Sequence, residues 1–279
     1  MQQTDGFLTG RVARWLIPVA AILALGVWLY VAPPGLLGKL AAIGYAVCHR
    51  LDSHSLHIGS LQMPLCARCT GEFNAAAVAL VFQGLLSGRG SQFPRRGILA
   101  AFGVLFLAFG LDGLNSYVAL IKTTSPGALA AIPNPYVTSN VTRVFTGSGM
   151  GLVLAGVLYP MYNASVWRAP RSVPALTWRQ FGILLGVLLV LDGAILTESP
   201  YVLYPVAVVS ALGVLALLCM VFSIAWIMIM RQDNTFEQVS QLWLPALAGL
   251  TLAFVLILGI DWVRFSLTQT WGGFPGLNG

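Results

Sequence analysis

The chain has 279 residues, of which 57% are hydrophobic and only 9% are charged, with a mean hydropathy of +0.82 and a net charge of +6. Soluble domains carry roughly 25% charged residues, so this composition excludes an ordinary soluble protein and predicts an integral membrane protein. Most of the positive charge is arginine in short connections, without the aromatic-interleaved basic patches or glycine-rich phosphate loops of nucleotide and nucleic-acid binders. We therefore expect the lipid bilayer as a partner, and no nucleic acid.

Seven apolar runs are long enough to cross a hydrocarbon core about 30 Å thick at 1.5 Å per residue. They predict an all-α polytopic membrane protein with about seven transmembrane helices, within a range of six to eight. The expected spans are residues 13–32, 72–88, 97–121, 142–164, 179–198, 201–230 and 242–265. The first run lacks a clean cleavage site, so we expect an uncleaved helix rather than a signal peptide. Residues 35–47 are too short to cross and predict a re-entrant or interfacial helix.

The distribution of Lys and Arg over the connections predicts the orientation. With the amino terminus inside, the inner side holds nine arginines: Arg11, Arg14, Arg89, Arg95, Arg96, Arg168, Arg171, Arg179 and Arg231. The outer side then holds six cations: Lys39, Arg50, Lys122, Arg68, Arg143 and Arg264. This excess favours an amino terminus on the inner side of a cytoplasmic membrane, with the connection between the first two spans on the outer side.

That outer connection contains six of the seven Cys and His residues of the chain: Cys48, His49, His54, His57, Cys66 and Cys69. Thiolates and imidazoles bind soft metals and carry out redox chemistry near neutral pH. Two residues separate Cys66 from Cys69, a spacing that lets both sulfurs bind one tetrahedral ion, and Cys48 with a histidine could complete the site. The alternative interpretation is a passive disulfide or inert thiols with solvated histidines.

The same residues argue against haem and iron–sulfur cofactors. A c-type haem requires histidine directly after the second cysteine of the pair, where this chain has Thr70, and the expected spans contain no histidine to ligate a b-type haem. An all-cysteine iron–sulfur cluster would need the remote Cys219, which we interpret as a packing residue. No haem is expected.

Five acidic residues lie in or at the ends of the expected spans, all in the outer half: Glu72, Asp112, Asp192, Glu198 and Asp261. A carboxylate within the bilayer costs at least about 2.5 kcal/mol, so it usually faces a cavity or a partner. We expect an acidic intramembrane pocket beneath the Cys/His segment, with Arg143 as the partner of the acids and Asn115 and Asn140 as neighbours. Asp112 and Arg143 are the candidate catalytic residues. The alternative is that each acid caps a helix end.

Two longer motifs accompany the cysteines: Pro-Leu-Cys-Ala-Arg-Cys-Thr-Gly at residues 64–71, preceded by Cys48-His49, and Ser-Asn-x-x-Arg-x-x-Thr-Gly at 139–147, preceded by Asp112-Gly113. Together they resemble the signature of a prokaryotic family of uncharacterised polytopic membrane proteins, over roughly residues 45–155. The resemblance implies a prokaryotic cytoplasmic membrane and a shared site without an established reaction. It divides the chain into a family-like membrane domain, 1–164, with the motif loop at about 45–72, and additional transmembrane helices of the same bundle, 165–279.

One departure from the family pattern ranks the ligands. The family has Arg-Ser-Phe where this chain has His54-Ser55-Leu56. Cys48, His49, Cys66 and Cys69 are therefore the preferred metal ligands, and His54 and His57 take second rank.

Several functions remain open from the sequence. The first is an outward-facing, zinc-like metal site over the acidic pocket; four protein ligands favour a structural ion, although adjacent Cys48 and His49 on one ion would strain the backbone. The second is a thiol–disulfide oxidoreductase with a quinone as cofactor, in which Arg68 would lower the thiol pKa of Cys66 and Cys69. The third is a non-catalytic subunit of a larger respiratory or photosynthetic membrane complex, and the fourth is a transporter.

Overall fold

The computed structural model describes residues 3–125 and 127–273. Within them the helices are α1 (Gln3–Val31), α2 (Leu36–Val47), α3 (Ala67–Leu86), α4 (Arg96–Thr124), α5 (Asn140–Val166), α6 (Trp178–Ile195), α7 (Pro200–Ile229) and α8 (Trp243–Thr268). The strands are β1 (Ser55–Ile58), β2 (Leu61–Cys66), β3 (Gly90–Gln92) and β4 (Arg171–Pro174). Seven helices are long and apolar enough to cross a membrane, which confirms the predicted all-α polytopic class.

The observed spans follow the expected ones closely, with one informative difference. The second span begins at Ala67 rather than near residue 72, so Arg68 and Cys69 belong to the first turn of α3 and not to a loop. Hydropathy alone places a charged residue outside the membrane, but Arg68 has a carboxylate partner on a neighbouring helix and can be accommodated within the span. The short expected helix is also present, as α2.

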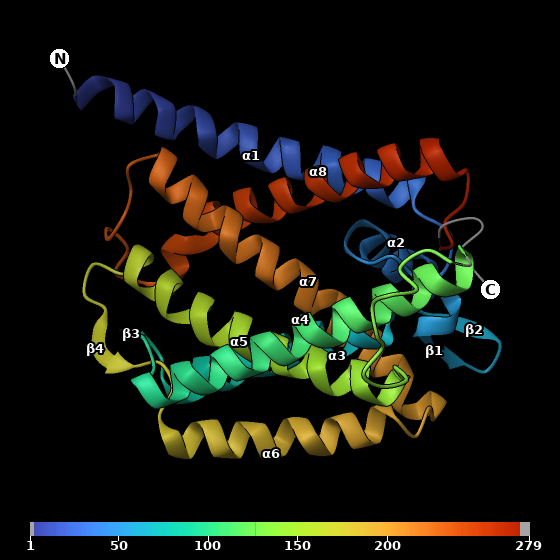
Figure 1. Cartoon of the computed structure of the whole chain (residues 1–279). Coiled ribbons are helices and arrows are strands. Elements are labelled where there is room, and N and C mark those ends of the chain that lie inside the picture. The colour runs from blue at the N-terminus through green and yellow to red at the C-terminus, as the bar shows by residue number, and fades with distance from the viewer. Residues whose placement is uncertain (1–2, 126, 274–279) are drawn as a thin grey trace.

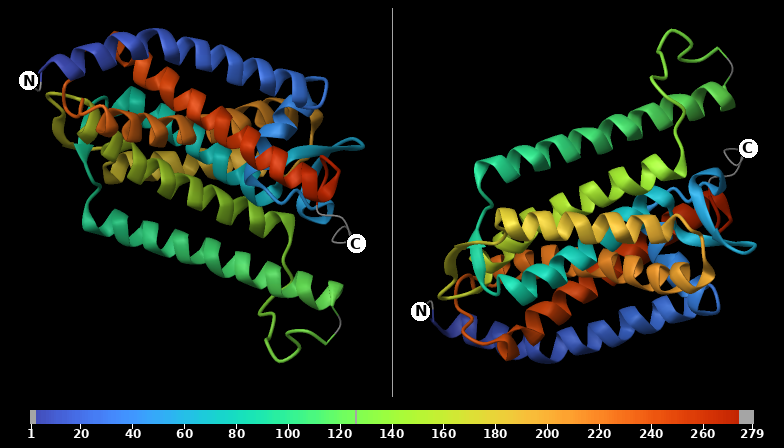
Figure 2. Two further views of the ribbon diagram at one scale, coloured as in Figure 1. Left: turned by 90° about the horizontal axis from the view of Figure 1, so that it is seen from above. Right: turned by 90° about the horizontal axis from the view of Figure 1, so that it is seen from below.

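The long helices run roughly along one common direction (Figure 1). The antiparallel β1–β2 hairpin and the carboxyl-terminal end of α8 lie at one end of the bundle, and the parallel β3–β4 pair lies at the other. Figure 2 shows α1 and α4 at opposite edges of the bundle. The Cys/His segment therefore shares its end of the molecule with the end of α8 and the connection between α4 and α5.

Glycines bring α3 and α5 into close contact. A Cβ atom added to Gly147 or Gly151 of α5 would lie 2.0 Å from the carbonyl oxygen of Arg68 or Glu72, respectively, and one added to Gly71 of α3 would lie 2.4 Å from the α5 backbone. Small residues four apart allow helix backbones in a membrane to approach in this way. This contact fixes the first turn of α3, which carries Arg68 and Cys69, against α5.

Helices from the second half of the chain pack on the first half. Gly213 of α7 lies against the backbone of Phe73 on α3, where an added Cβ would be 2.1 Å from the carbonyl oxygen. The rings of Trp28 on α1 and Phe254 on α8 lie 5.2 Å apart, in the same core cluster as Cys48 and Cys66. The additional helices are thus part of the surroundings of the Cys/His segment.

Candidate functional site

Three cysteines from separate elements converge at the end of the bundle. Cys48 follows α2, Cys66 ends β2, and Cys69 lies in the first turn of α3. Their Sγ atoms all lie within 4.8 Å of one another, and all three are free thiols, with Cys48 and Cys66 buried. Sulfurs bound to one tetrahedral zinc ion at about 2.3 Å lie about 3.8 Å apart. The three sulfurs are therefore close enough to bind a single soft ion after a small shift of the side chains.

Backbone N–H groups support the sulfur of Cys48. It accepts hydrogen bonds from the amides of Cys66 at 3.3 Å and Arg50 at 3.4 Å. Arg50 adopts a left-handed conformation with φ of 52°, which costs a non-glycine residue about 1–3 kcal/mol and turns the chain sharply after His49. The buried Arg50 side chain holds this turn by donating to the carbonyl oxygen of Trp271 at 2.5 Å.

The three histidines of this segment have different partners. His49 Nδ1 lies 3.6 Å from Cys48 Sγ, but His49 is outside the group of ligand atoms that lie within 4.8 Å of one another, so its ring must shift to join all three sulfurs. His49 Nε2 lies 3.3 Å from His54 Nδ1, so His54 stands directly behind the first ring. His57 turns away and pairs with Asp52 at 2.9 Å on the surface. Of the three histidines, His49 contacts a cysteine sulfur, His54 contacts His49, and His57 contacts Asp52.

The cysteines share negative charge unequally. Burial opposes ionisation of the Cys48 thiol, but hydrogen bonds from Cys66, Cys69 and His49 outweigh it and lower its pKa well below the usual value. The hydrogen bond to Cys48 raises the pKa of the Cys66 thiol. Burial and the nearby charges of Arg143 and His49 lower the pKa of His54 to about 4, so its ring is neutral at pH 7. These opposite shifts of pKa favour the thiolate at Cys48 over the thiolate at Cys66.

Arg264 ties α8 to this segment. Its guanidinium donates to the carbonyl oxygens of Tyr45 and Cys48 at 2.5 Å each and of His49 at 2.8 Å, and it lies 3.9 Å from the centre of the Tyr45 ring. Four polar or aromatic groups of α2 and the following turn are thus held by one side chain. This role of Arg264 was not expected from the sequence. The available signal was an arginine in an apolar span, which requires a partner.

Asp112 is the centre of a second polar cluster beside the cysteines. Its side chain is 1% exposed and accepts hydrogen bonds from Arg68, from Tyr136 Oη at 2.7 Å and from Thr146 Oγ1 at 3.3 Å. Arg68 also donates to Ser116 Oγ at 3.0 Å. Because Arg68 lies between Cys66 and Cys69, the two clusters share one turn of backbone.

This arrangement corrects two expectations about arginines. The partner of Asp112 is Arg68, whereas Arg143 donates to Asn140 Oδ1 and Thr138 Oγ1, each at 3.0 Å. Arg143 lies at the first turn of α5, and the earlier start of α3 brings Arg68 to the depth of Asp112 instead. Since the Arg68 guanidinium is engaged with Asp112, it does not serve the thiols as expected.

The acids do not gather in one pocket among the described residues. Asp192 accepts a 2.5 Å hydrogen bond from Ser148, Glu198 is exposed, and Asp261 lines a separate pocket between α1 and α8. Beneath the Cys/His segment lie Asp112, within a mixed-charge cluster, and Glu72, which is one turn after Cys69 on α3 and interacts electrostatically with Cys48 and Arg68. A common depth in the membrane does not specify which side of a helix a residue faces, and this is why Asp192, Glu198 and Asp261 lie apart from the other two acids.

Comparison with known proteins gives one match. Residues 48–157 match a family model described as "Predicted membrane protein (DUF2085)". The matched region contains the three clustered cysteines and the Asp112 cluster, and it agrees with the extent expected from the motifs. No curated protein and no solved structure matches the chain.

Proposed function

We propose that this protein is a metal-binding integral membrane protein in which Cys48, His49, Cys66 and Cys69 hold one zinc-like ion. The observation that carries the proposal is the convergence of three thiol sulfurs within 4.8 Å, with His49 Nδ1 3.6 Å from the nearest of them. Mixed sulfur and nitrogen donors in a tetrahedral set are typical of zinc.

The proposed ion has a structural role. Three cysteines and one histidine fill a tetrahedral shell and leave no position for substrate. The ion would join the end of α2, the hairpin and the first turn of α3, and so fix Arg68 opposite Asp112. Positive charge from the ion would also allow Cys66 and Cys69 to ionise together with Cys48. Asp112 and Arg143 remain the candidates for any reaction beside it.

Metal analysis of the protein purified in a mild detergent tests this proposal. We expect about one zinc per chain in the wild type and loss of the metal in Cys48→Ser, Cys66→Ser and Cys69→Ser. Cys219→Ser is the matched control, because Cys219 lies in α7 outside the cluster and should leave the zinc content unchanged. Cobalt loading of the wild type, read as a visible thiolate-to-metal band, tests the site without any variant.

The same purified protein distinguishes the metal site from its main alternative, a thiol–disulfide oxidoreductase. A metal-free protein with an oxidised Cys66–Cys69 pair by thiol counting would overturn the metal proposal and favour a thiol–disulfide oxidoreductase with a quinone partner. Burial of Cys48 and Cys66 supports the metal proposal over this alternative, because exchange requires an accessible thiolate.

The proposed location is the cytoplasmic membrane of a prokaryote, with the amino terminus inside and the Cys/His segment outside. The arginine-rich connections at the β3–β4 end support this orientation. Alkaline phosphatase fused after residue 132 should be active and one fused after residue 92 inactive, with green fluorescent protein fusions giving the reverse pattern. The opposite result would invert the topology.

A further inference from the structure

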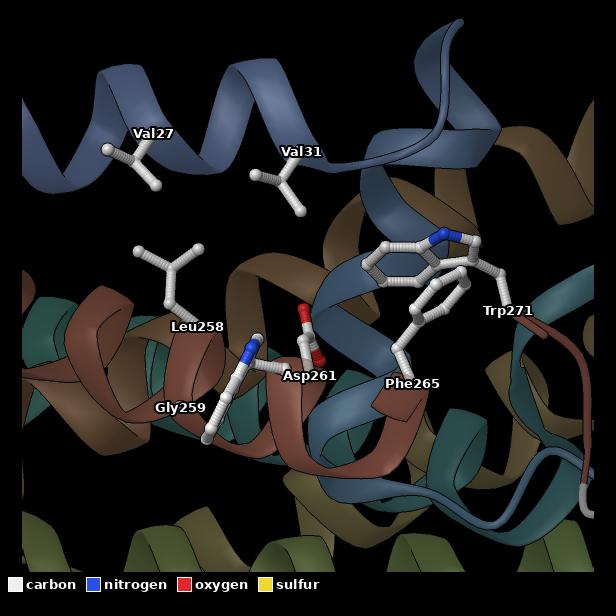
Figure 3. Close-up of a pocket in the computed structure, with 8 residues that line it drawn as sticks. Val27, Val31, Leu258, Gly259, Asp261, Phe265 and Trp271 are labelled. Atoms are coloured by element: carbon white, nitrogen blue, oxygen red, sulfur yellow. The ribbon is translucent and has the colours of Figure 1, made fainter. Parts of the chain in front are cut away.

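A pocket of about 480 Å³ lies between α1 and α8, away from the cysteine cluster. Val27 and Val31 of α1 form one wall, and Leu258 and Phe265 of α8 form the other (Figure 3). Trp271 covers it from the segment after α8. Its size falls within the range of about 300–1,000 Å³ that is usual for small-molecule sites.

One carboxyl group points into this apolar space. Asp261 lies between the α1 valines and the Phe265 and Trp271 rings in Figure 3. The residue is 2% exposed, and among the described residues its Oδ1 atom has no hydrogen-bond partner. A buried polar atom left without a partner costs about 1–3 kcal/mol, and an acid inside a membrane usually marks a functional site. The pocket thus contains an acceptor that needs a donor or a cation.

The other lining groups favour a cation. Trp262, Phe265 and Trp271 line the pocket together with Asp261, and the rings of Phe265 and Trp271 are 5.4 Å apart. Aromatic faces combined with a carboxylate are the usual surroundings of a bound ammonium group. Arg264, nearly one turn further along α8, donates its hydrogen bonds to the carbonyl oxygens of Tyr45, Cys48 and His49, while its charge also interacts with Asp261 over a longer range.

The depth of Asp261 suits an amphipathic ligand. It lies seven residues before Thr268, where α8 ends, which corresponds to about 10 Å along the helix. Val27, Val31 and Trp262 are exposed on the surface that faces lipid. A molecule at the edge of the bilayer can therefore place its head at Asp261 and its apolar part along α1 and α8.

We infer that this pocket binds an amphipathic ammonium compound, with the cationic head at Asp261 and the alkyl part against Val27, Val31 and Leu258. Two sources offer this chemistry: the ethanolamine headgroup of a membrane lipid and a free lipophilic amine. This binding does not require the proposed metal, because no residue of the pocket is a proposed metal ligand; Trp271 meets the Cys/His segment and α2 through its carbonyl oxygen, which accepts from Arg50, and through its ring, which lies against Tyr45.

Photo-crosslinking with a diazirine-bearing dodecylammonium probe tests the inference. The full chain is placed in phosphatidylglycerol nanodiscs, which contain no ammonium lipid, and labelled peptides are mapped by mass spectrometry. We expect labelling of the α1 and α8 segments that line the pocket, competed by unlabelled dodecylammonium and not by dodecanol. Replacing part of the phosphatidylglycerol with phosphatidylethanolamine identifies the source: reduced labelling indicates the lipid headgroup, and unchanged labelling indicates a free amine.

Two variants and one control keep the test specific. Asp261→Asn removes the charge with little change of shape and should lower labelling at least tenfold. Gly259→Leu fills the pocket while keeping the carboxyl, and an added Cβ there meets no atom within 4 Å, so the helix should fold and labelling should fall equally. Asp192→Asn, a buried acid on α6 that can still accept from Ser148, should label as the wild type does. Equal labelling of Asp261→Asn and wild type, or labelling outside α1, α8 and Trp271, would overturn the inference.

Discussion

Arg68 and Asp112 form a buried ion pair that joins the first turn of α3 to the middle of α4. The side chains are 16% and 1% exposed, and Arg68 is also the residue between Cys66 and Cys69. The turn of backbone that carries Cys66 and Cys69 is therefore held in place by the Arg68–Asp112 pair as well as by the contacts of the two sulfurs. A substitution of Asp112 should therefore alter the positions of the two cysteines, although the carboxylate does not contact them.

Asp112→Ala should be strongly destabilising. It leaves the Arg68 guanidinium inside the bundle without its carboxylate, and removing one partner of a buried pair costs about 3–5 kcal/mol. Asp112→Asn should cost less, because its oxygen still accepts from Tyr136 or Arg68. Thermal unfolding in detergent measures both. Glu237→Gln provides the control, since the Arg168–Glu237 pair is 69% and 56% exposed and should contribute about 0–1 kcal/mol. Similar losses of stability in Asp112→Ala and Glu237→Gln would show that the buried pair contributes no more than the exposed one.

The glycines of the two motifs should be required for packing rather than for chemistry. Gly147→Ala places a Cβ 2.0 Å from the carbonyl oxygen of Arg68, so α3 and α5 must separate. We expect a loss of at least about 1–3 kcal/mol and a reduced yield of monodisperse protein on size exclusion. Gly182→Ala on α6 is the matched control, because an added Cβ there meets no atom within 4 Å. A wild-type melting temperature for Gly147→Ala would contradict the tight α3–α5 contact.

The three histidines should contribute unequally to metal binding. His49→Ala removes a proposed ligand, and we expect the visible spectrum of the cobalt-loaded protein to change as water replaces nitrogen. His54→Ala should keep the spectrum but weaken affinity about 10–100-fold, because His54 Nδ1 lies 3.3 Å from the far nitrogen of His49, where a hydrogen bond between the two rings orients His49. His57→Ala should alter neither, since His57 pairs with Asp52 on the surface. A spectral change in His57→Ala, or none in His49→Ala, would refute this order.

Hydropathy predicted the helices well, and residue spacing predicted that Cys66 and Cys69 lie together, because both features depend on residues close in the sequence. Seven spans and the short α2 follow from the lengths of the apolar runs, and the spacing of Cys66 and Cys69 brings their sulfurs together within one turn. The pairing of Arg68 with Asp112 could not be predicted in the same way. It depends on the rotation of α3 about its axis, which is determined by the close contacts of Gly71 with the α5 backbone and of Gly147 with the α3 backbone. The separation of Asp261 from Asp112 likewise reflects which neighbours their helices have.

Arg264 should control how well the turn after α2 presents Cys48 and His49. Its guanidinium binds the carbonyl oxygens of both residues, so Arg264→Gln removes most of these contacts while leaving every proposed ligand in place. We expect the dissociation constant for zinc, measured by chelator competition, to rise about 10–100-fold, as for other groups that orient ligands. Arg264→Lys should recover only part of the affinity, because one ammonium cannot reach all the carbonyls at once. Arg179→Gln, an exposed arginine at the start of α6, should bind zinc as the wild type does. If Arg264→Gln lowers the melting temperature of zinc-free protein but leaves the dissociation constant unchanged, Arg264 secures helix packing and has no part in positioning the ligands.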